Sequence, residues 1–102
     1  MGSERAKNMV LKALRIAHGY SITQVSELSG CSKWTVSATE NGNRKVSKKI
    51  LEKITSIYSI DIFQVNQLIK YYDSLDFDEF TKYQFTLLKI LNILLKNTGK
   101  SL

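Results

Sequence analysis

The sequence contains no proline and only one cysteine, and each shortage excludes a class of structure. A single cysteine cannot form an internal disulfide or a cysteine-based metal cluster, which suits a reducing cytoplasm. Without proline, and without the alternation of apolar and polar residues that marks strands, the pattern favours helices. The chain is therefore expected to be all-α.

Long apolar runs and clustered reactive groups are also missing. The most apolar stretch, residues 85–95, is interrupted by Thr86, Lys89 and Asn92, so no membrane span is expected. His18 is the only histidine, and its place at a helix end favours capping over catalysis or metal binding. No set of nucleophile, base and acid and no phosphate-binding glycine loop is recognisable. We therefore expect neither an enzyme nor a cofactor, metal or small-molecule substrate.

Acidic residues are scarce relative to basic ones, and the imbalance is confined to one part of the chain. The 102 residues include 15 Lys and Arg against 9 Asp and Glu, a net charge of +6. Residues 1–60 hold ten basic and four acidic side chains, whereas residues 61–102 hold five of each. The whole positive surplus lies in the first sixty residues, as expected if that segment meets a polyanion.

Apolar residues at helical spacing, together with capping residues, predict six helices in a chain long enough for one small domain. The predicted helices are Glu4–His18, a second capped by Ser21 and ending at Ser29, Lys33–Asn41 capped by Ser32, a fourth opened by Ser47, a fifth capped by Asp61 and reaching Tyr72, and Glu79–Asn97.

Residues 20–42 have the spacing of a helix-turn-helix. In a unit that starts at Ile22, the small residues Ser26 and Gly30 stand at the fifth and ninth places, where two short helices can pack at a steep angle. β-Branched or apolar residues stand where the seam between the helices needs them, at Val25, Cys31 and Val36. The second helix is then free to point outward, which in such motifs usually means into a DNA groove.

Residues 10–65 resemble the Xre family of bacterial and phage regulators, the class of the lambdoid repressors and Cro proteins. The resemblance rests on the run LRIAHGYSI, the turn Gly30–Lys33, the ending Glu40–Gly42 and the stretch ILEKITSIYSIDIFQV. It implies a five-helix lambda-repressor-like DNA-binding domain in residues 1–72. An additional C-terminal helix, in residues 73–102, would follow as a dimerisation element.

The resemblance also assigns roles to single residues, with double-stranded DNA as the partner. It implies base contacts by Lys33, Trp34, Thr35 and Ala38. It implies phosphate contacts by Ser21, Ser32, Ser37, Asn41, Arg44 and Lys45. Arg15 and Glu40 take the places of a structural pair that joins the first and third helices. The first alternative is that Trp34 packs over the helix junction or a dimer contact. The others are that Arg44 and Lys45, with Lys48 and Lys49, form only a solvated basic face, and that Arg15 and Glu40 are simply exposed at the surface.

The last predicted helix is unusually apolar. Eight of its apolar residues between Phe80 and Leu95 spread over roughly 160°, wider than the ~100° stripe of a helix that covers a single core, and Phe85 and Ile93 lie outside even this arc. Leu87, Leu91 and Leu94 lie at the centre of this arc and are expected to contact a second copy of the chain. The alternative is that the helix packs back on the first and fifth helices of its own domain.

These observations predict a cytoplasmic, homodimeric regulator of transcription that represses by occupying a two-half-site operator. Two other functions stay open. The chain would be a protein-interaction module, such as an antitoxin-like or anti-repressor subunit, if the apolar last helix binds a different protein. It would be the front part of a longer peptide-sensing regulator if residues 61–102 begin a set of helical repeats.

Overall fold

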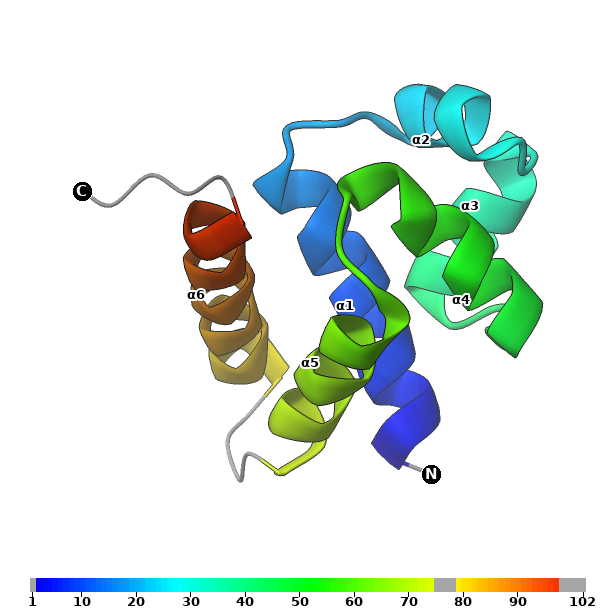
Figure 1. The fold of residues 1–102 in the computed structure, drawn as a ribbon. Helices are drawn as coiled ribbons and strands as arrows, with labels where there is room; N and C mark the ends of the chain where they lie inside the picture. The colour runs from blue at the N-terminus through cyan, green and yellow to red at the C-terminus, as the bar shows by residue number, and fades with distance from the viewer. Residues whose placement is uncertain (1, 75–78, 98–102) are drawn as a thin grey trace.

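The computed structural model describes residues 2–74 and 79–97, and their regular secondary structure is entirely helical (Figure 1). The helices are α1 (Gly2–Ala17), α2 (Ile22–Ser29), α3 (Lys33–Asn41), α4 (Lys48–Thr55), the short 3-10 helix η1 (Ser56–Tyr58), α5 (Ile62–Ser74) and α6 (Glu79–Asn97). The expected all-α class is confirmed. The first helix begins two residues before its predicted start and ends one residue before its predicted end.

Local side chains fix where the helices of the central segment begin and end. Ser21, Ser32 and Ser47 are N-caps, and each hydroxyl accepts a hydrogen bond from the backbone N–H three residues later. Gly30 and Gly42 end α2 and α3 with φ of 79° and 80°, a left-handed conformation that side chains with a Cβ rarely adopt. The two short helices therefore stop where glycine stands.

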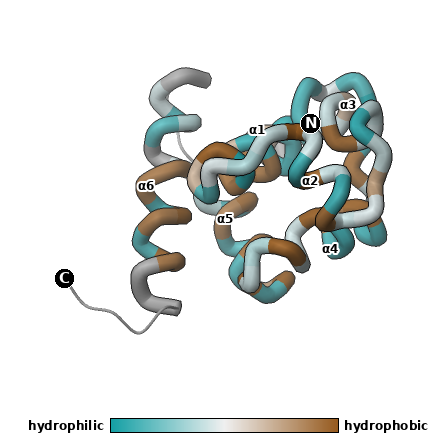
Figure 2. The backbone as a smooth tube through the Cα atoms, turned by 90° about the horizontal axis from the view of Figure 1, so that it is seen from above, coloured by the Kyte–Doolittle hydropathy of each residue, from teal (hydrophilic) through white to brown (hydrophobic). Residues whose placement is uncertain are grey.

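The helices form three groups. In two views at right angles, α1 and α5 lie in the middle, with α6 on one side and α2, α3 and α4 on the other (Figures 1 and 2). One core joins the groups. Its fully buried side chains come from all of them and include Val10, Leu14, Val25, Val36, Ile54, Leu68 and Ile90. Because Ile90 belongs to α6, the last helix is part of the core and not an appendage beside it.

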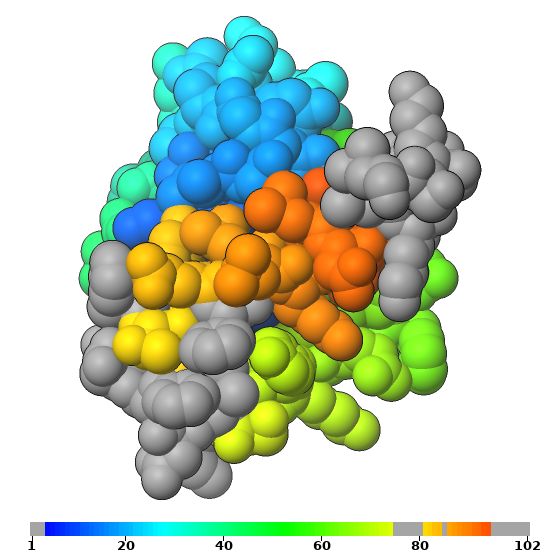
Figure 3. All heavy atoms as spheres, turned by 90° about the vertical axis from the view of Figure 1, so that its left-hand side faces the viewer, coloured from blue at the N-terminus to red at the C-terminus, as the bar shows by residue number. Residues whose placement is uncertain are grey.

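The packing of α6 covers part of the surface that was predicted for dimerisation. The helix lies across one side of the molecule against α1 and α5 (Figure 3). Leu87 and Leu94 share the inward side of α6 with Ile90, and both are half-buried against the core. The free apolar surface of the described helix is instead Leu88, 63% exposed, with Leu91, 44% exposed. The angles of the side chains around α6 did not show which part of the arc the domain itself covers.

Parts of the predicted C-terminal segment lie outside the described residues. These are the link at residues 75–78, the end at residues 98–102 with its predicted stop at Gly99, and the side chains of Phe80 and Leu95. That residues 73–102 serve assembly stays a prediction.

Burial of Tyr58 makes the free energy of unfolding fall at high pH. Its side chain is fully buried, its hydroxyl has no hydrogen-bond partner among the described residues, and burial raises its pKa. The folded state therefore keeps the phenolic proton, whereas the unfolded state releases it above about pH 10. The stabilisation is complete below that pH and is lost as pH rises through the folded-state pKa.

Tyr58→Phe is therefore expected to leave the unfolding free energy at pH 7 unchanged or slightly higher. At pH 11 the unfolding free energy of the variant should exceed that of the unaltered protein by a further ~1 kcal/mol, because the variant lacks the titrating group. Urea unfolding at the two pH values measures the difference. Parallel losses in both proteins would mean that the Tyr58 proton does not contribute.

Candidate nucleic-acid interface

Polar side chains of α1 hold α3 and the loop that follows it. The Glu4 carboxylate accepts a hydrogen bond from the Val46 N–H at 2.8 Å, and the Asn8 side-chain amide donates to the Thr39 carbonyl. Glu4, Asn8 and Arg15 fall within about 40° of one another around α1, at 100° per residue. Sequence reasoning missed Glu4 and Asn8. Their shared face with Arg15 was the signal that could have found them.

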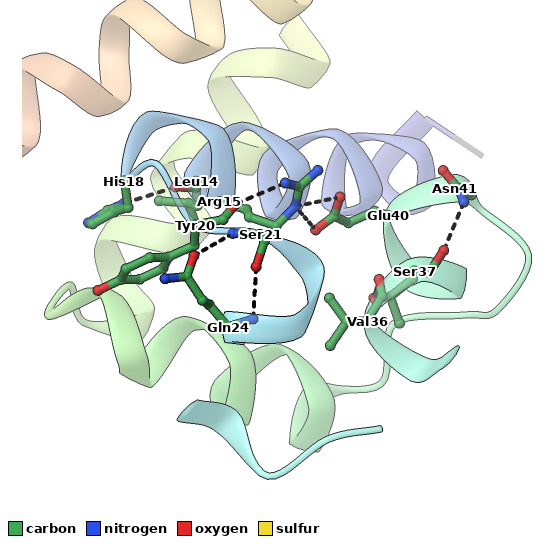
Figure 4. Close-up of polar contacts among 11 residues, drawn as sticks. Leu14, Arg15, His18, Tyr20, Ser21, Gln24, Val36, Ser37, Glu40 and Asn41 are labelled. Atoms are coloured by element: carbon green, nitrogen blue, oxygen red, sulfur yellow. Dashed lines mark hydrogen bonds and ion pairs between the residues drawn. The ribbon is translucent and has the colours of Figure 1, made fainter. Parts of the chain in front are cut away.

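Arg15 ties three parts of the chain together. Its Nε donates to both carboxylate oxygens of Glu40, at 3.1 and 2.8 Å, and its Nη1 donates to the Tyr20 carbonyl at 3.0 Å (Figure 4). The two side chains are 17% and 5% exposed, and the hydrogen bond that Arg15 donates to Glu40 raises the pKa of Arg15. The pair therefore fixes α3 against α1 through a largely desolvated contact.

Side chains stabilise both ends of α2. At the N-terminus of α2, the side chains of Ser21 and Gln24 each accept a hydrogen bond from the other's backbone N–H (Figure 4). Ser26 donates its hydroxyl proton to the Cys31 carbonyl at 2.7 Å, one residue beyond Gly30. Cys31 itself is half-buried against the core, as a seam residue should be. These contacts leave the outer side of α3 open.

Four side chains form an outward stripe on α3, which we define as Lys33, Trp34, Ser37 and Asn41. At 100° per residue they span about 100° of the helix. Lys33, Trp34 and Asn41 are exposed, Trp34 at 65%. Asn41 donates to the Ser37 hydroxyl at 3.2 Å, which links the middle of the stripe to its end (Figure 4). The buried side chains Val36, Thr39 and Glu40 lie outside this stripe, and Glu40 contacts Arg15 of α1.

Ala38 lies outside the outward stripe, and its predicted base contact stays a prediction. It is only 4% exposed. The Asn43 N–H donates to the Ala38 carbonyl at 2.9 Å, at the end of α3. Ser37 and Asn41, predicted as phosphate contacts, have the outward position that Ala38 lacks.

Arg44 lies over the first part of α3, although it belongs to the following loop. Its Nη1 donates to the Thr35 hydroxyl at 3.3 Å, and its guanidinium carbon is 6.0 Å from the centre of the Trp34 ring. Thr35 is half-buried and also receives a hydrogen bond from the Ser32 hydroxyl at 2.9 Å. The hydroxyl of Thr35, which was predicted to contact a base, is thus hydrogen-bonded to both Ser32, the N-cap of α3, and Arg44. Lys45 is exposed and stays in the loop.

The predicted phosphate contacts Ser21 and Ser32 are exposed, and their hydroxyls already cap α2 and α3. At such helix starts the first backbone N–H groups point away from the helix and favour anions. The two serines can therefore act by fixing those helix starts as well as by direct contact.

The side chain of His18, the only histidine, makes its contacts within the domain. His18 Nδ1 is 2.9 Å from the Leu14 carbonyl, and the ring packs on Tyr58 and Tyr20, with centroids 4.6 and 5.9 Å away. Within residues 2–74 and 79–97 no three His, Cys, Asp or Glu side chains gather as metal ligands. In the same ranges no helix is both long enough and apolar enough to cross a membrane.

Two short helices joined at a glycine turn, the second held by α1 and open on its outer side, define a helix-turn-helix DNA-binding protein. A family model described as Helix-turn-helix matches residues 11–65, more than half of the chain. No curated protein and no solved structure matches the chain. The chain belongs to the Xre-like helix-turn-helix family, and it is a DNA-binding regulator of transcription.

Proposed function

We propose that this protein represses transcription by binding, as a homodimer, to an operator with two half-sites. The observation that carries the proposal is the outward stripe of α3, in which Lys33, Trp34 and Asn41 are exposed. An uncovered helix of this kind enters the major groove, and symmetric dimers place two such helices on half-sites that are one helical turn, or a multiple of it, apart.

The charges around α3 support DNA as its ligand. Exposed basic side chains lie on α3, in the loop after it and at the start of α4: Lys33, Arg44, Lys45, Lys48 and Lys49. Lys33 lies at the N-terminal end of α3, where a lysine can donate to guanine O6 and N7. Lys45 lies in the loop, at the flank of the helix, where a phosphate contact is expected.

These two positions predict different binding defects. Lys33→Ala should weaken binding to the preferred duplex by about 1–3 kcal/mol and relax the choice of base at one position. Lys45→Ala should weaken binding to all duplexes alike and reduce the slope of log affinity against log salt by about one unit.

Titrations of labelled duplexes at several salt concentrations measure both effects. An equal loss on every sequence for Lys33→Ala would remove Lys33 from base readout. If neither variant changed affinity, DNA binding through this surface would be contradicted.

For assembly we propose that Leu88 and Leu91 meet the same residues of a second copy. This surface of α6 faces away from α1 and α5, and α6 lies on the side of the molecule opposite α3 (Figure 1). A contact there would leave both outward stripes free for DNA. Residues 73–102 would then serve assembly as well as the core.

Repression is tested by placing the preferred duplex across a promoter in a purified transcription reaction. Transcript should fall as the protein is added, because a bound dimer excludes the polymerase. A rise in transcript would make the protein an activator.

A further inference from the structure

We propose that Trp34 and Arg44 act as one unit that reads a thymine and a guanine lying within two base-pair steps of each other in the major groove. The proposal rests on the proposed DNA binding and adds a sequence preference to it. Arg44, which the family resemblance assigns to phosphate, becomes a base reader, while Lys45 keeps the phosphate role.

Arg44 is pre-positioned by two neighbours. Its Nη1 bonds to the Thr35 hydroxyl, and its guanidinium lies beside the Trp34 ring. The hydrogen bond uses one of five N–H donors, so the guanidinium keeps a fork that fits O6 and N7 of guanine. Because an arginine held in place loses less conformational freedom on binding, this arrangement favours the guanine contact. The N-terminal half of α3, where Arg44 lies, is also the part of such a helix that enters the groove.

Trp34 presents a large apolar surface beside that fork. It is 65% exposed, and the hydrophobic effect favours covering such a side chain. The thymine C5-methyl is the apolar group that base pairs present in the major groove. The guanidinium and the ring centre are 6.0 Å apart, and bases along a strand are spaced by about 3.4 Å. This separation is a little under two base-pair steps, so the two groups are placed to reach base pairs within two steps of each other.

Thr35 is the positioning residue of this unit. Its hydroxyl accepts hydrogen bonds from Ser32 at 2.9 Å and from Arg44 at 3.3 Å, so it links the helix cap to the guanidinium. It need not touch a base itself.

The test uses base analogues that remove single groups from the DNA. A preferred duplex is first selected from random sequences with the full chain. Each thymine is then replaced in turn by deoxyuridine, which lacks only the methyl group, and each guanine by 7-deazaguanine, which lacks the N7 acceptor. For the unaltered protein, one deoxyuridine position should weaken binding about fivefold and one 7-deazaguanine position about tenfold. The two positions should lie within two steps of each other.

The variants assign those two positions to side chains. Trp34→Ala should lose its sensitivity to the deoxyuridine, and Arg44→Gln its sensitivity to the 7-deazaguanine. Trp34→Ala should also reduce the 7-deazaguanine penalty, because Arg44 then lacks one of its supports. Lys45→Gln removes the same charge as Arg44→Gln and should keep both sensitivities while binding all duplexes more weakly. Trp34 and Arg44 are exposed, and circular dichroism checks that their variants keep the helical fold.

The outcomes separate this proposal from the proposed function. If binding is selective but Arg44→Gln loses affinity equally on every duplex, Arg44 is a phosphate contact and the proposal is overturned. The same holds if the two sensitive positions lie farther apart, or if the Trp34 and Arg44 effects are independent. If the unaltered protein selects no duplex at all, the proposed function fails together with this inference.

Discussion

Replacing Leu88 and Leu91 together with lysine is expected to give a folded, helical monomer whose affinity for a duplex with two half-sites falls by about 100-fold or more. Each monomer must then bind its half-site without a neighbour that raises its effective concentration. Both leucines are exposed in the single chain, so the substitutions should not disturb its core. In a symmetric contact they would place four lysines against one another.

Sedimentation of the unaltered protein at tens of micromolar, without DNA, gives the reference for this prediction. Phe63→Lys is the matched control, because Phe63 is also exposed, at 68%, but belongs to α5. The control should sediment and bind DNA as the unaltered protein does. A monomeric unaltered protein would refute the homodimer and favour a different protein as the partner of α6. An unfolded double variant would mean that Leu88 and Leu91 support the chain's own core.

Glu40→Ala is expected to lower the unfolding free energy by about 3 kcal/mol, because it leaves the Arg15 charge largely out of water without its partner. Arg15→Ala should cost a similar amount, since it strands the Glu40 carboxylate and frees the Tyr20 carbonyl. The double variant should lose clearly less than the sum of the two, because the stranded charge is absent. Each single variant should also bind DNA more weakly, because α3 loses a contact with α1.

Urea unfolding of the four proteins gives the coupling energy. Glu52→Ala is a suitable control, since Glu52 is an exposed acid on α4, and its removal should change stability by less than about 0.5 kcal/mol. Additive losses for Arg15 and Glu40 would show that the two charges do not interact in solution. The orientation of α3 would then depend on the other contacts of α1, those of Glu4 and Asn8.

The helices and their ends could be predicted from the sequence because their causes are local. A serine hydroxyl three residues from the N–H that it caps, or a glycine with positive φ at a helix end, acts within one turn of chain. The basic surplus of the first sixty residues is a property of composition and needs no fold. The spacing of Ser26 and Gly30 predicted the helix-turn-helix for the same reason, because the two helices are neighbours in sequence.

Only the tertiary structure decided which surfaces stay open. Periodicity gives the angle of a side chain around its own helix, but burial depends on segments that arrive from elsewhere. Ala38 has an angle compatible with base contact, yet it is covered. The angles of Leu87 and Leu94 around α6 are also compatible with a contact to a partner chain. In the structure, however, α6 packs against α1 and α5, and both leucines are partly buried against the core. Arg44 lies nine residues beyond Thr35, and only the turn at Gly42 brings its guanidinium back to α3.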